Sequence, residues 1–330
     1  AELMSYRQQL QEITRLLIEA HDLLTIALGF DQPRGYLVLS QNNDELRPSG
    51  GYIGTYGWIG LQEGEITEFG YGATTPQSPN PPSRELESEL EIPAWWMRFS
   101  QPIYAAWDGS WHADFRDTAE MAKWFYDLGE NPLSPVDGVI AIDVMGFEYL
   151  MRALGSIDVP GYDITVTADN FREVIYDFRA VGIERDEAGR EAHKAFLAAL
   201  YPEIFYKLET LRENAGQEQL IEVLYAVNRA LREKHILLYF VDQQLNDFAD
   251  SMGWTGRQFP AVDHDYLMVV DANMTNKSNR SIVREIDLQV GIQPDGSLRN
   301  TLIVDYAYPA SLAENDPALT ILELVTNPPT

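Results

Sequence analysis

The chain has 330 residues, of which 45% are hydrophobic and 11% aromatic, so it can bury a sizeable core in one large domain or two ordinary ones. Its 24 Lys and Arg stand against 51 Asp and Glu, and this net charge of −27 argues against nucleic acid as a partner, because few cations are present to neutralise phosphates. Cysteine is absent, which excludes disulfides, thiolate chemistry and Cys-ligated metals.

The chain is predicted to begin with an amphipathic helix over residues 2–28. Leu3, Tyr6, Leu10 and Ile13 recur there at helical spacing, and Gly29 is a suitable C-terminal stop. No run of about 18 apolar residues occurs, so no transmembrane helix is predicted in this chain.

Two β-favouring runs, Tyr36–Leu39 and Tyr52–Leu61, are predicted strands on either side of a polar loop. We call residues 42–51, which read NNDELRPSGG, the signature loop. An Arg beside backbone N–H groups makes an anion seat plausible, and a polar loop whose side chains cap their own backbone is the alternative. The ligand-binding candidates are Asn42, Asn43, Glu45, Arg47, Ser49, Gly50 and Gly51.

An aromatic cluster follows in residues 91–115, which hold four of the seven tryptophans: Trp95, Trp96, Trp107 and Trp111. Flat rings of this kind can line a groove for a sugar or a lipid chain, and packing in the core is the alternative interpretation. Asp108, His112 and Asp114 lie directly beside this cluster. Such oxygen-rich sites suit Mg²⁺ or Ca²⁺ as a cofactor. The alternative is that these acids serve as helix caps and surface charges.

The region from residue 117 to residue 252 alternates helices and strands. Asp117 is the expected N-cap of a helix that Gly129 ends, with Glu120 at the capping-box position. The further helices expected cover 145–154, 187–211, 217–233 and 243–252, with one more that begins at Thr167 or Asp169 and runs to about Phe178. The expected strands cover 136–144, 157–159, 164–166 and 235–242. This rhythm predicts an α/β sandwich.

The last part of the chain changes character. Residues 265–270, 281–292 and 298–306 alternate apolar and polar side chains, which predicts an antiparallel β unit. We therefore expect three parts: an N-terminal helix over 1–33, an α/β core over 34–260, and a C-terminal β-rich unit over 261–330 that packs on or extends the core.

The stretch QNNDELRPSGGYIGTYG resembles the signature of the DUF4012 family, QN-x-E-L-R-P-T-G-G-F-I, with Ser49 in place of Thr and Tyr52 in place of Phe. WDGSWHADF, VDGVIAIDVMGFEYLMRALGSIDVP and DYLMVVDANMTNKSN support this resemblance, which covers roughly residues 30–310. The family is bacterial and envelope-associated and has no settled activity. The resemblance implies an extracytoplasmic or secreted location and a membrane anchor outside this chain.

VDGVIAIDVMGFEYLMRALGSIDVP is also similar, more weakly, to the LytR-CpsA-Psr family, which attaches glycopolymers to cell walls. That similarity implies a mixed sheet flanked by helices. In that family arginines hold a lipid-linked pyrophosphate and an Asp with Mg²⁺ assists transfer, so Arg47 and Arg190 are the positions that correspond. Ser156 replaces a glycine of the family's turn, and His193 and Lys194 stand where it has Gln, so the departures weaken the case for catalysis.

Three functions remain open from the sequence. The first is a non-catalytic envelope domain that binds or scaffolds a glycopolymer, a lipid-linked sugar or a protein partner. The second is a LytR-CpsA-Psr-like phosphotransferase acting on a polyprenyl-pyrophosphate-linked glycan. The third is a structural subunit of a cell-surface or membrane-associated assembly.

Overall fold

The computed structural model describes residues 21–75, 77–87, 109–184, 192–211, 216–259, 265–273, 277–314 and 316. The first described element is α2 (His21–Ala27), which is the described end of the predicted N-terminal helix. Gly29 follows it with a φ of +74°, a conformation that favours glycine and stops the helix. In the part of the chain described, no helix is long and apolar enough to cross a membrane.

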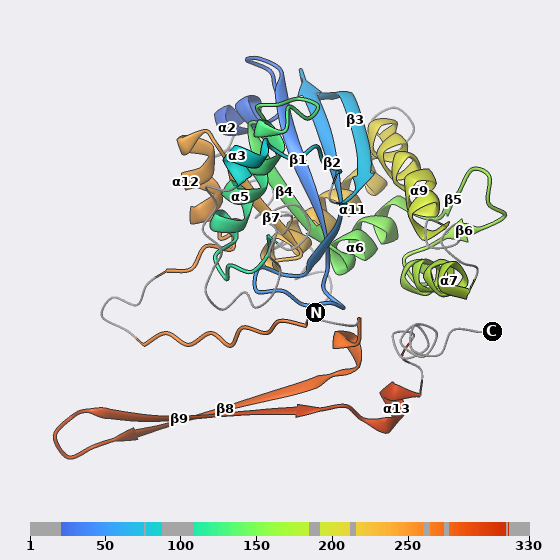
Figure 1. The fold of residues 1–330 in the computed structure, drawn as a ribbon. Helices are drawn as coiled ribbons and strands as arrows, with labels where there is room; N and C mark the ends of the chain where they lie inside the picture. The colour runs from blue at the N-terminus through green and yellow to red at the C-terminus, as the bar shows by residue number, and fades with distance from the viewer. Residues whose placement is uncertain are drawn as a thin grey trace.

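A five-stranded mixed sheet forms the centre of the molecule (Figure 1). Its order is β3-β2-β1-β4-β7; β1 and β4 are parallel, and the other neighbours are antiparallel. The strands are β1 (Arg34–Asn42), β2 (Tyr52–Gln62), β3 (Glu65–Ala73), β4 (Gly138–Asp143) and β7 (Ile236–Phe240).

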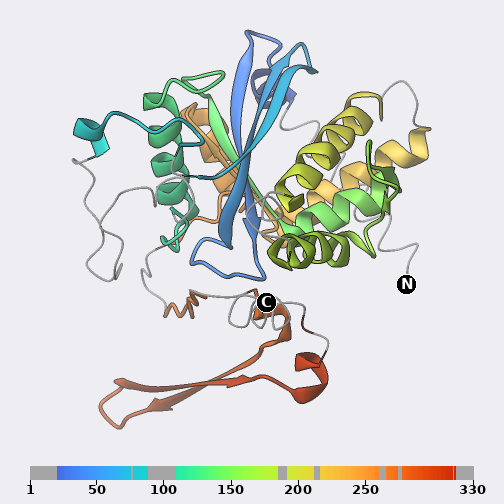
Figure 2. The same cartoon turned by 45° about the vertical axis from the view of Figure 1, so that its right-hand side comes forward.

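Helices cover both faces of this sheet, as Figure 2 shows. α5 (Phe115–Leu128) packs on one face, where Leu37 and Leu39 of β1 belong to the same core cluster as Phe115. The intervening Val38 points to the other face and packs against a second core cluster. The helices on that face are α6 (Val144–Leu154), α7 (Phe171–Glu184), α9 (Ala192–Glu209) and α11 (Gln217–Arg232).

The smaller elements complete this architecture. They are α3 (Arg84–Glu87), β5 (Ile157–Asp158), β6 (Thr165–Val166), α12 (Gln243–Ser251), the 3₁₀ turn η1 (Asn279–Ser281) and α13 (Ala310–Ala313). The predicted fold class, a mixed sheet flanked by helices with a C-terminal antiparallel β unit, is confirmed.

β3 was not expected from the sequence. Its residues, EITEFGYGA, include acids and glycines that disfavour a strand. Glu63 and Gly64 both have positive φ, at 53° and 77°, which is the geometry of a two-residue turn that twists with its strands. The turn thus suits an antiparallel pairing of β3 with β2, and Phe69 and Tyr71 of β3 stack on Phe205 and Tyr201 of α9.

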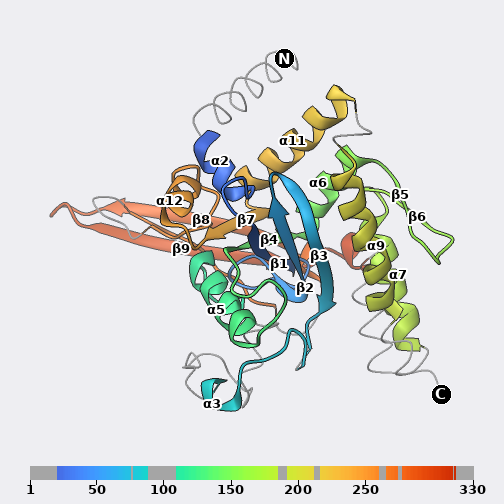
Figure 3. The same cartoon turned by 90° about the horizontal axis from the view of Figure 1, so that it is seen from above.

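Two expectations were wrong. The N-cap of α5 is Asp114 and not Asp117, because the Asp114 carboxylate accepts the N–H of Arg116 at 3.0 Å whereas Asp117 lies exposed in the first turn. Residues 265–270 do not form a strand. The C-terminal antiparallel unit is a two-stranded hairpin of β8 (Val283–Ile292) and β9 (Leu298–Ala307). It lies apart from the central sheet in Figure 1, and in the view from above in Figure 3 it passes behind the sheet.

Candidate functional site

The signature loop lies at the carboxyl end of β1, beside the carboxyl end of the parallel strand β4. The register pairs Gln41 of β1 with Asp143 of β4, and α6 begins at the next residue. Carboxyl ends of parallel strands are where α/β sheets place ligands, because loops and helix N-termini converge there. The topology therefore makes this edge of the sheet the candidate site.

Asp44 is the buried anchor of the loop, and it is 2% exposed. Arg172 of α7 donates to its Oδ1 and the Tyr176 hydroxyl to its Oδ2, both at 2.7 Å. Arg172 also pairs with Glu148 of α6 at 2.8 Å. Burial opposes the charge on Arg172, but Asp44 and Glu148 outweigh it and raise the guanidinium pKa. Burial, with Asp44, also raises the pKa of Tyr176. The loop is thus fastened to two helices by compensated charges.

Glu45 organises the second set of charges in the loop. Its two oxygens contact Arg47, at 3.4 Å, and Lys277. The Arg47 guanidinium is 4% exposed; it donates to the carbonyls of Leu46, at 3.1 Å, and of Asn273, and it lies 5.3 Å from the centre of the Tyr52 ring. Arg47 is therefore held by a carboxylate, two carbonyls and an aromatic ring, which are the kinds of group that stabilise a buried guanidinium.

Asn273 and Asn279 are bound to this loop through backbone hydrogen bonds. The Asn273 N–H donates to the Leu46 carbonyl at 2.8 Å, and the Asn279 N–H donates to the Asp44 carbonyl at 3.1 Å. The Asn279 side chain accepts the Leu46 N–H at 3.1 Å. Asp44, Glu45, Leu46 and Arg47 thus take part in docking a segment more than 220 residues away, which explains the density of polar groups in the signature.

Asn43 connects the loop to the sheet edge. Its Nδ2 donates to Asp143 Oδ2 at 3.0 Å, and His235 Nδ1 lies 2.7 Å from the same oxygen. Asp143 Oδ1 meanwhile caps α6 by accepting the Gly146 N–H at 2.8 Å. The hydrogen bond to Asp143 raises the pKa of His235. One carboxylate therefore joins the loop, the first turn of α6 and the start of β7.

The small residues at the end of the loop hydrogen-bond to Ser110 and allow a tight backbone path. The Ser49 N–H donates to the Ser110 carbonyl at 3.2 Å, and the Ser110 hydroxyl donates to the Gly51 carbonyl at 2.7 Å. A Cβ on Gly51 would lie 2.4 Å from the backbone carbonyl oxygen of Asn42, and Gly50 has a φ of +132°. Both glycines are thus required by the backbone path.

The candidate residues Asn42, Asn43, Glu45 and Arg47 do not form a single side-chain network. Glu45 and Arg47 are paired, but the Asn42 side chain accepts the N–H of Asp44 at 2.9 Å, and Asn43 bonds to Asp143. The sequence did not point to Asp44, Asp143, Tyr176, His235 or Lys277. No local signal identifies them, since each acts on a partner brought near by the fold.

The other candidates are not gathered at this site in the described residues. Trp111 is 2% exposed and packs inside the molecule, while Trp95, Trp96, Trp107, Asp108 and Arg190 lie outside the described residues. Asp114 is engaged as a cap, and its Oδ2 accepts the Gln258 N–H at 3.0 Å. His112 lies 3.8 Å from Asp117. Among the residues described, no group of three or more His, Asp or Glu side chains is placed to hold a metal.

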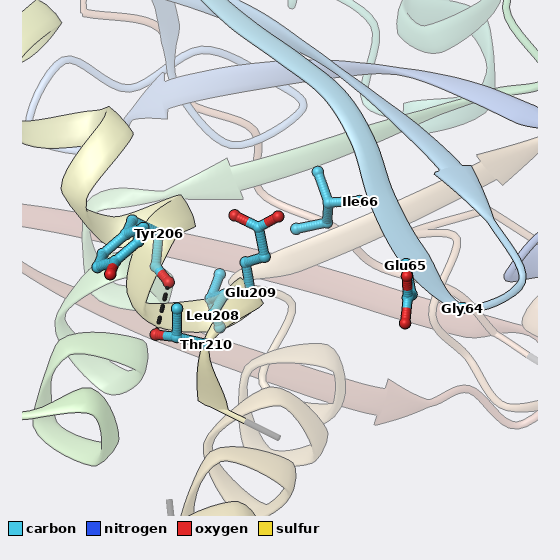
Figure 4. A pocket seen from close by; sticks show the side chains of 7 residues that line it. All are labelled: Gly64, Glu65, Ile66, Tyr206, Leu208, Glu209 and Thr210. Carbon is cyan, nitrogen blue, oxygen red and sulfur yellow. Dashed lines mark hydrogen bonds between the residues drawn. The ribbon is translucent and has the colours of Figure 1, made fainter. Parts of the chain in front are cut away.

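A surface pocket of about 450 Å³ lies elsewhere (Figure 4). It is lined by Gly64, Glu65, Ile66, Tyr206, Leu208, Glu209 and Thr210, between the β2–β3 turn and the end of α9. Because β2 runs from the signature loop to this turn, the pocket is at the opposite end of the sheet. Its two carboxylates make it unsuited to an anionic ligand.

The fold and the site together define an α/β domain whose polar signature loop fastens helices and a distant segment. Residues 31–177 match the model of the family described as "Protein of unknown function (DUF4012)". The resemblance predicted from the signature is confirmed over this range. The stretch DYLMVVDANMTNKSN, from which Asn273, Lys277 and Asn279 contact the loop, lies beyond it.

Similar solved structures include Lin1025 of Listeria innocua, with 11% identity, a TM-score of 0.31 and coverage of 90% of this chain and 99% of that chain. The Bacillus subtilis protein yvhJ, titled a transcriptional regulator, has 13% identity, a TM-score of 0.32 and coverage of 89% and 97%. TagV of B. subtilis has 11% identity, a TM-score of 0.34 and coverage of 90% of this chain and 98% of that chain. All three are of the LytR-CpsA-Psr type. No curated protein matches the sequence.

Proposed function

We propose that this protein is a non-catalytic, extracytoplasmic domain of the bacterial envelope that binds or scaffolds a glycopolymer, a lipid-linked sugar or a protein partner. The observation that carries the proposal is that the charged groups in and around the signature loop are paired with groups of the same chain. Arg47 contacts Glu45 and two carbonyls, and Arg172 contacts Asp44 and Glu148. The loop's charges hold the fold together.

A pyrophosphate clamp needs at least two cations that converge on the ligand. To serve as such a clamp, Arg47 would have to leave its partners, and Glu45 would then face the incoming anion. The excess of acids over bases in the chain adds an unfavourable field around any anion. These points support a binding role over the alternative, a phosphotransferase in which Arg47 and Arg190 hold a polyprenyl-pyrophosphate-linked glycan with Mg²⁺.

The experiment that tests this proposal combines binding and turnover. Purified protein is titrated with cell-wall glycopolymer and with a polyprenyl-pyrophosphate-linked sugar, and transfer of the sugar is followed in the presence of Mg²⁺. We expect saturable binding to one of these ligands and no transfer. Transfer that disappears in both Arg47→Ala and Arg190→Ala, but survives in Arg152→Ala, would replace the binding role with catalysis. Arg152 is a suitable control because its side chain is 63% exposed.

The third function, a structural subunit of a larger assembly, is favoured by one specific observation. The β8–β9 hairpin leaves large hydrophobic side chains exposed on both of its strands. Cross-linking of the protein in intact cells would test this function, and we expect a product larger than the single chain. A single-chain band alone would argue against an assembly role.

A further inference from the structure

The β8–β9 hairpin has one face that is almost entirely apolar. Residues directly opposite each other in an antiparallel pair share a face. The register therefore places together the pairs Arg284–Tyr306, Ile286–Val304, Leu288–Leu302, Val290–Asn300 and Ile292–Leu298. We call these ten side chains the apolar face. Six of its aliphatic residues, Ile286, Leu288, Val290, Ile292, Leu298 and Leu302, are between 42% and 77% exposed.

The opposite face of the hairpin has a different character. Glu285 lies opposite Asp305, and three further polar or charged side chains, Asp287, Gln289 and Thr301, share that face with Arg299. Its apolar members are fewer and more scattered: Val283, Ile303 and Ala307. Like charges directly opposite each other repel, so this side is suited to water and not to burial. The hairpin is thus amphipathic, with a face that needs to be covered and a face that needs to stay in solvent.

A neighbouring segment extends the apolar face without covering it. The Tyr306 hydroxyl donates to Asp271 at 2.6 Å, Arg284 pairs with Asp271, and the Asn300 side chain donates to Asp265 at 3.3 Å. Residues 265–271 therefore run beside the hairpin, and Tyr266, Leu267, Met268 and Val270 are exposed there. In the described residues, β8 and β9 pair only with each other, and a two-stranded hairpin alone is marginally stable in water.

We propose that the apolar face is covered by the same face of a second copy of this chain. Arg284 is the only charged side chain of the ten, and it is already paired with Asp271, so the face offers nothing that would recognise a charged partner. An apolar, self-complementary surface fits its own image about a two-fold axis. Packing two hairpins face to face also leaves both acidic faces in solvent.

The size of the surface can be compared with the area that a specific interface needs. Strands of ten residues at about 3.3 Å per residue, widened by residues 265–271, give a face on the order of 500 Å² per copy. Two copies would bury roughly 1,000 Å², which is the lower limit for a specific interface. We therefore expect a reversible dimer that forms as the protein concentration rises. The net charge of −27 on each copy opposes it, so added salt should strengthen it by screening.

A phospholipid surface is the other apolar occupant to consider. The acids on the opposite face and the overall negative charge would be repelled by anionic lipids. The dimer is therefore the occupant that agrees with both faces of the hairpin, and it does not depend on which ligand the domain binds.

Sedimentation velocity across a range of protein and salt concentrations tests the dimer. The matched variants are Leu288→Lys, at the centre of the apolar face, and its neighbour Gln289→Lys, which adds the same charge on the opposite face. We expect wild type and Gln289→Lys to dimerise with rising concentration, and Leu288→Lys to remain monomeric. Its melting temperature should equal that of dilute, monomeric wild type, because dimerisation stabilises the native state by mass action. Because the chain has no cysteine, Leu288→Cys should form a disulfide-linked dimer on oxidation and Gln289→Cys should not.

Three outcomes would overturn the proposal. A wild-type chain that stays monomeric at the highest concentration and salt has no such dimer. Equal loss of the dimer in both Lys variants places the interface elsewhere. A monomer that binds phosphatidylcholine vesicles, with binding lost in Leu288→Lys alone, assigns the face to a membrane.

Discussion

Arg47 illustrates how a residue that looks like a ligand-binding group in the sequence stabilises the structure. It is one of the few cations in a strongly acidic chain, and it lies in a loop rich in glycine and amides. In the folded protein its guanidinium contacts Glu45, the carbonyls of Leu46 and Asn273, and the ring of Tyr52. Arg47 is only 4% exposed, so its removal would leave these partners buried without a hydrogen-bond donor.

Replacing Arg47 by Ala should therefore lower the free energy of unfolding by about 1–3 kcal/mol, because buried acceptors lose their donor. Urea denaturation would measure this change. The control is Arg152→Ala, which removes an exposed pair with Asp169 and should change stability by less than about 1 kcal/mol. Equal effects of the two substitutions would show that the contacts of Arg47 are energetically idle.

His235 gives the site edge a pH dependence. Its hydrogen bond to Asp143 raises its pKa, Glu233 acts in the same direction, and desolvation and Arg229 act against it. A raised folded pKa means that the charged His stabilises the fold fully below its unfolded pKa of about 6.5. This contribution is lost as the pH rises through the folded pKa.

The variant His235→Gln should thus destabilise the protein more at about pH 5.5 than at about pH 9. At the lower pH the substitution removes a charged imidazole that stabilises the fold, whereas at the higher pH the imidazole is neutral and that contribution is already lost. Chemical denaturation of both proteins across this range is the measurement. His21→Gln serves as the control, because His21 is exposed on α2. A difference between wild type and His235→Gln that does not vary with pH would contradict the assignment.

At the scale of elements, the turn from the signature loop into β2 determines how the loop is shaped. Gly51 lies where a Cβ would be 2.4 Å from the Asn42 oxygen and 2.8 Å from the Asn43 nitrogen. These are backbone atoms of the same loop, so they cannot move aside without breaking the contacts of Asn43 and Asp44. The loop is therefore intolerant of even a methyl group at this position.

Gly51→Ala should destabilise the fold by more than about 1 kcal/mol, because the native backbone cannot accept the side chain. Thermal unfolding would show the loss. Gly291→Ala is the matched control: a Cβ there has no neighbour closer than 3.6 Å, and alanine is the better strand residue, so stability should be unchanged or slightly higher. Similar losses in the two variants would mean that steric crowding at Gly51 is not the cause.

At the scale of the whole molecule, the excess of acids governs the response to ions. A net charge of −27 makes the compact state repel itself, and salt screens that repulsion. Any cation should therefore raise the melting temperature to some extent. A specific metal site would add a further increase through mass action.

We predict that Mg²⁺ or Ca²⁺ raises the melting temperature no more than NaCl of equal ionic strength does. The reason is that Asp114 is already occupied by the N–H groups of Arg116 and Gln258. Differential scanning fluorimetry would make the comparison, with Asp114→Asn alongside. A larger shift with the divalent ion that Asp114→Asn removes would establish a metal site near residues 108–114.

The sequence by itself was sufficient for the class of fold. Helical and strand periodicities extend over a few residues, so α6, α11, β4 and the β8–β9 hairpin follow from local patterns. Gly29 and Gly129 also marked the ends of the helices that precede them. β3 was missed because acids and glycines interrupt its β-favouring residues. The cap of α5 was placed three residues late because Asp114 and Asp117 are chemically alike.

Only the tertiary structure decided what the signature loop does. Arg172 and Asp44 are 128 residues apart, and Lys277 and Glu45 are 232 residues apart, so no spacing in the chain reveals these pairs. Likewise, alternation over residues 265–270 favoured a strand, but a strand needs a hydrogen-bonded neighbour, and the fold supplies none among the described residues. Local patterns determine which elements form, whereas the path of the chain determines which charges compensate each other.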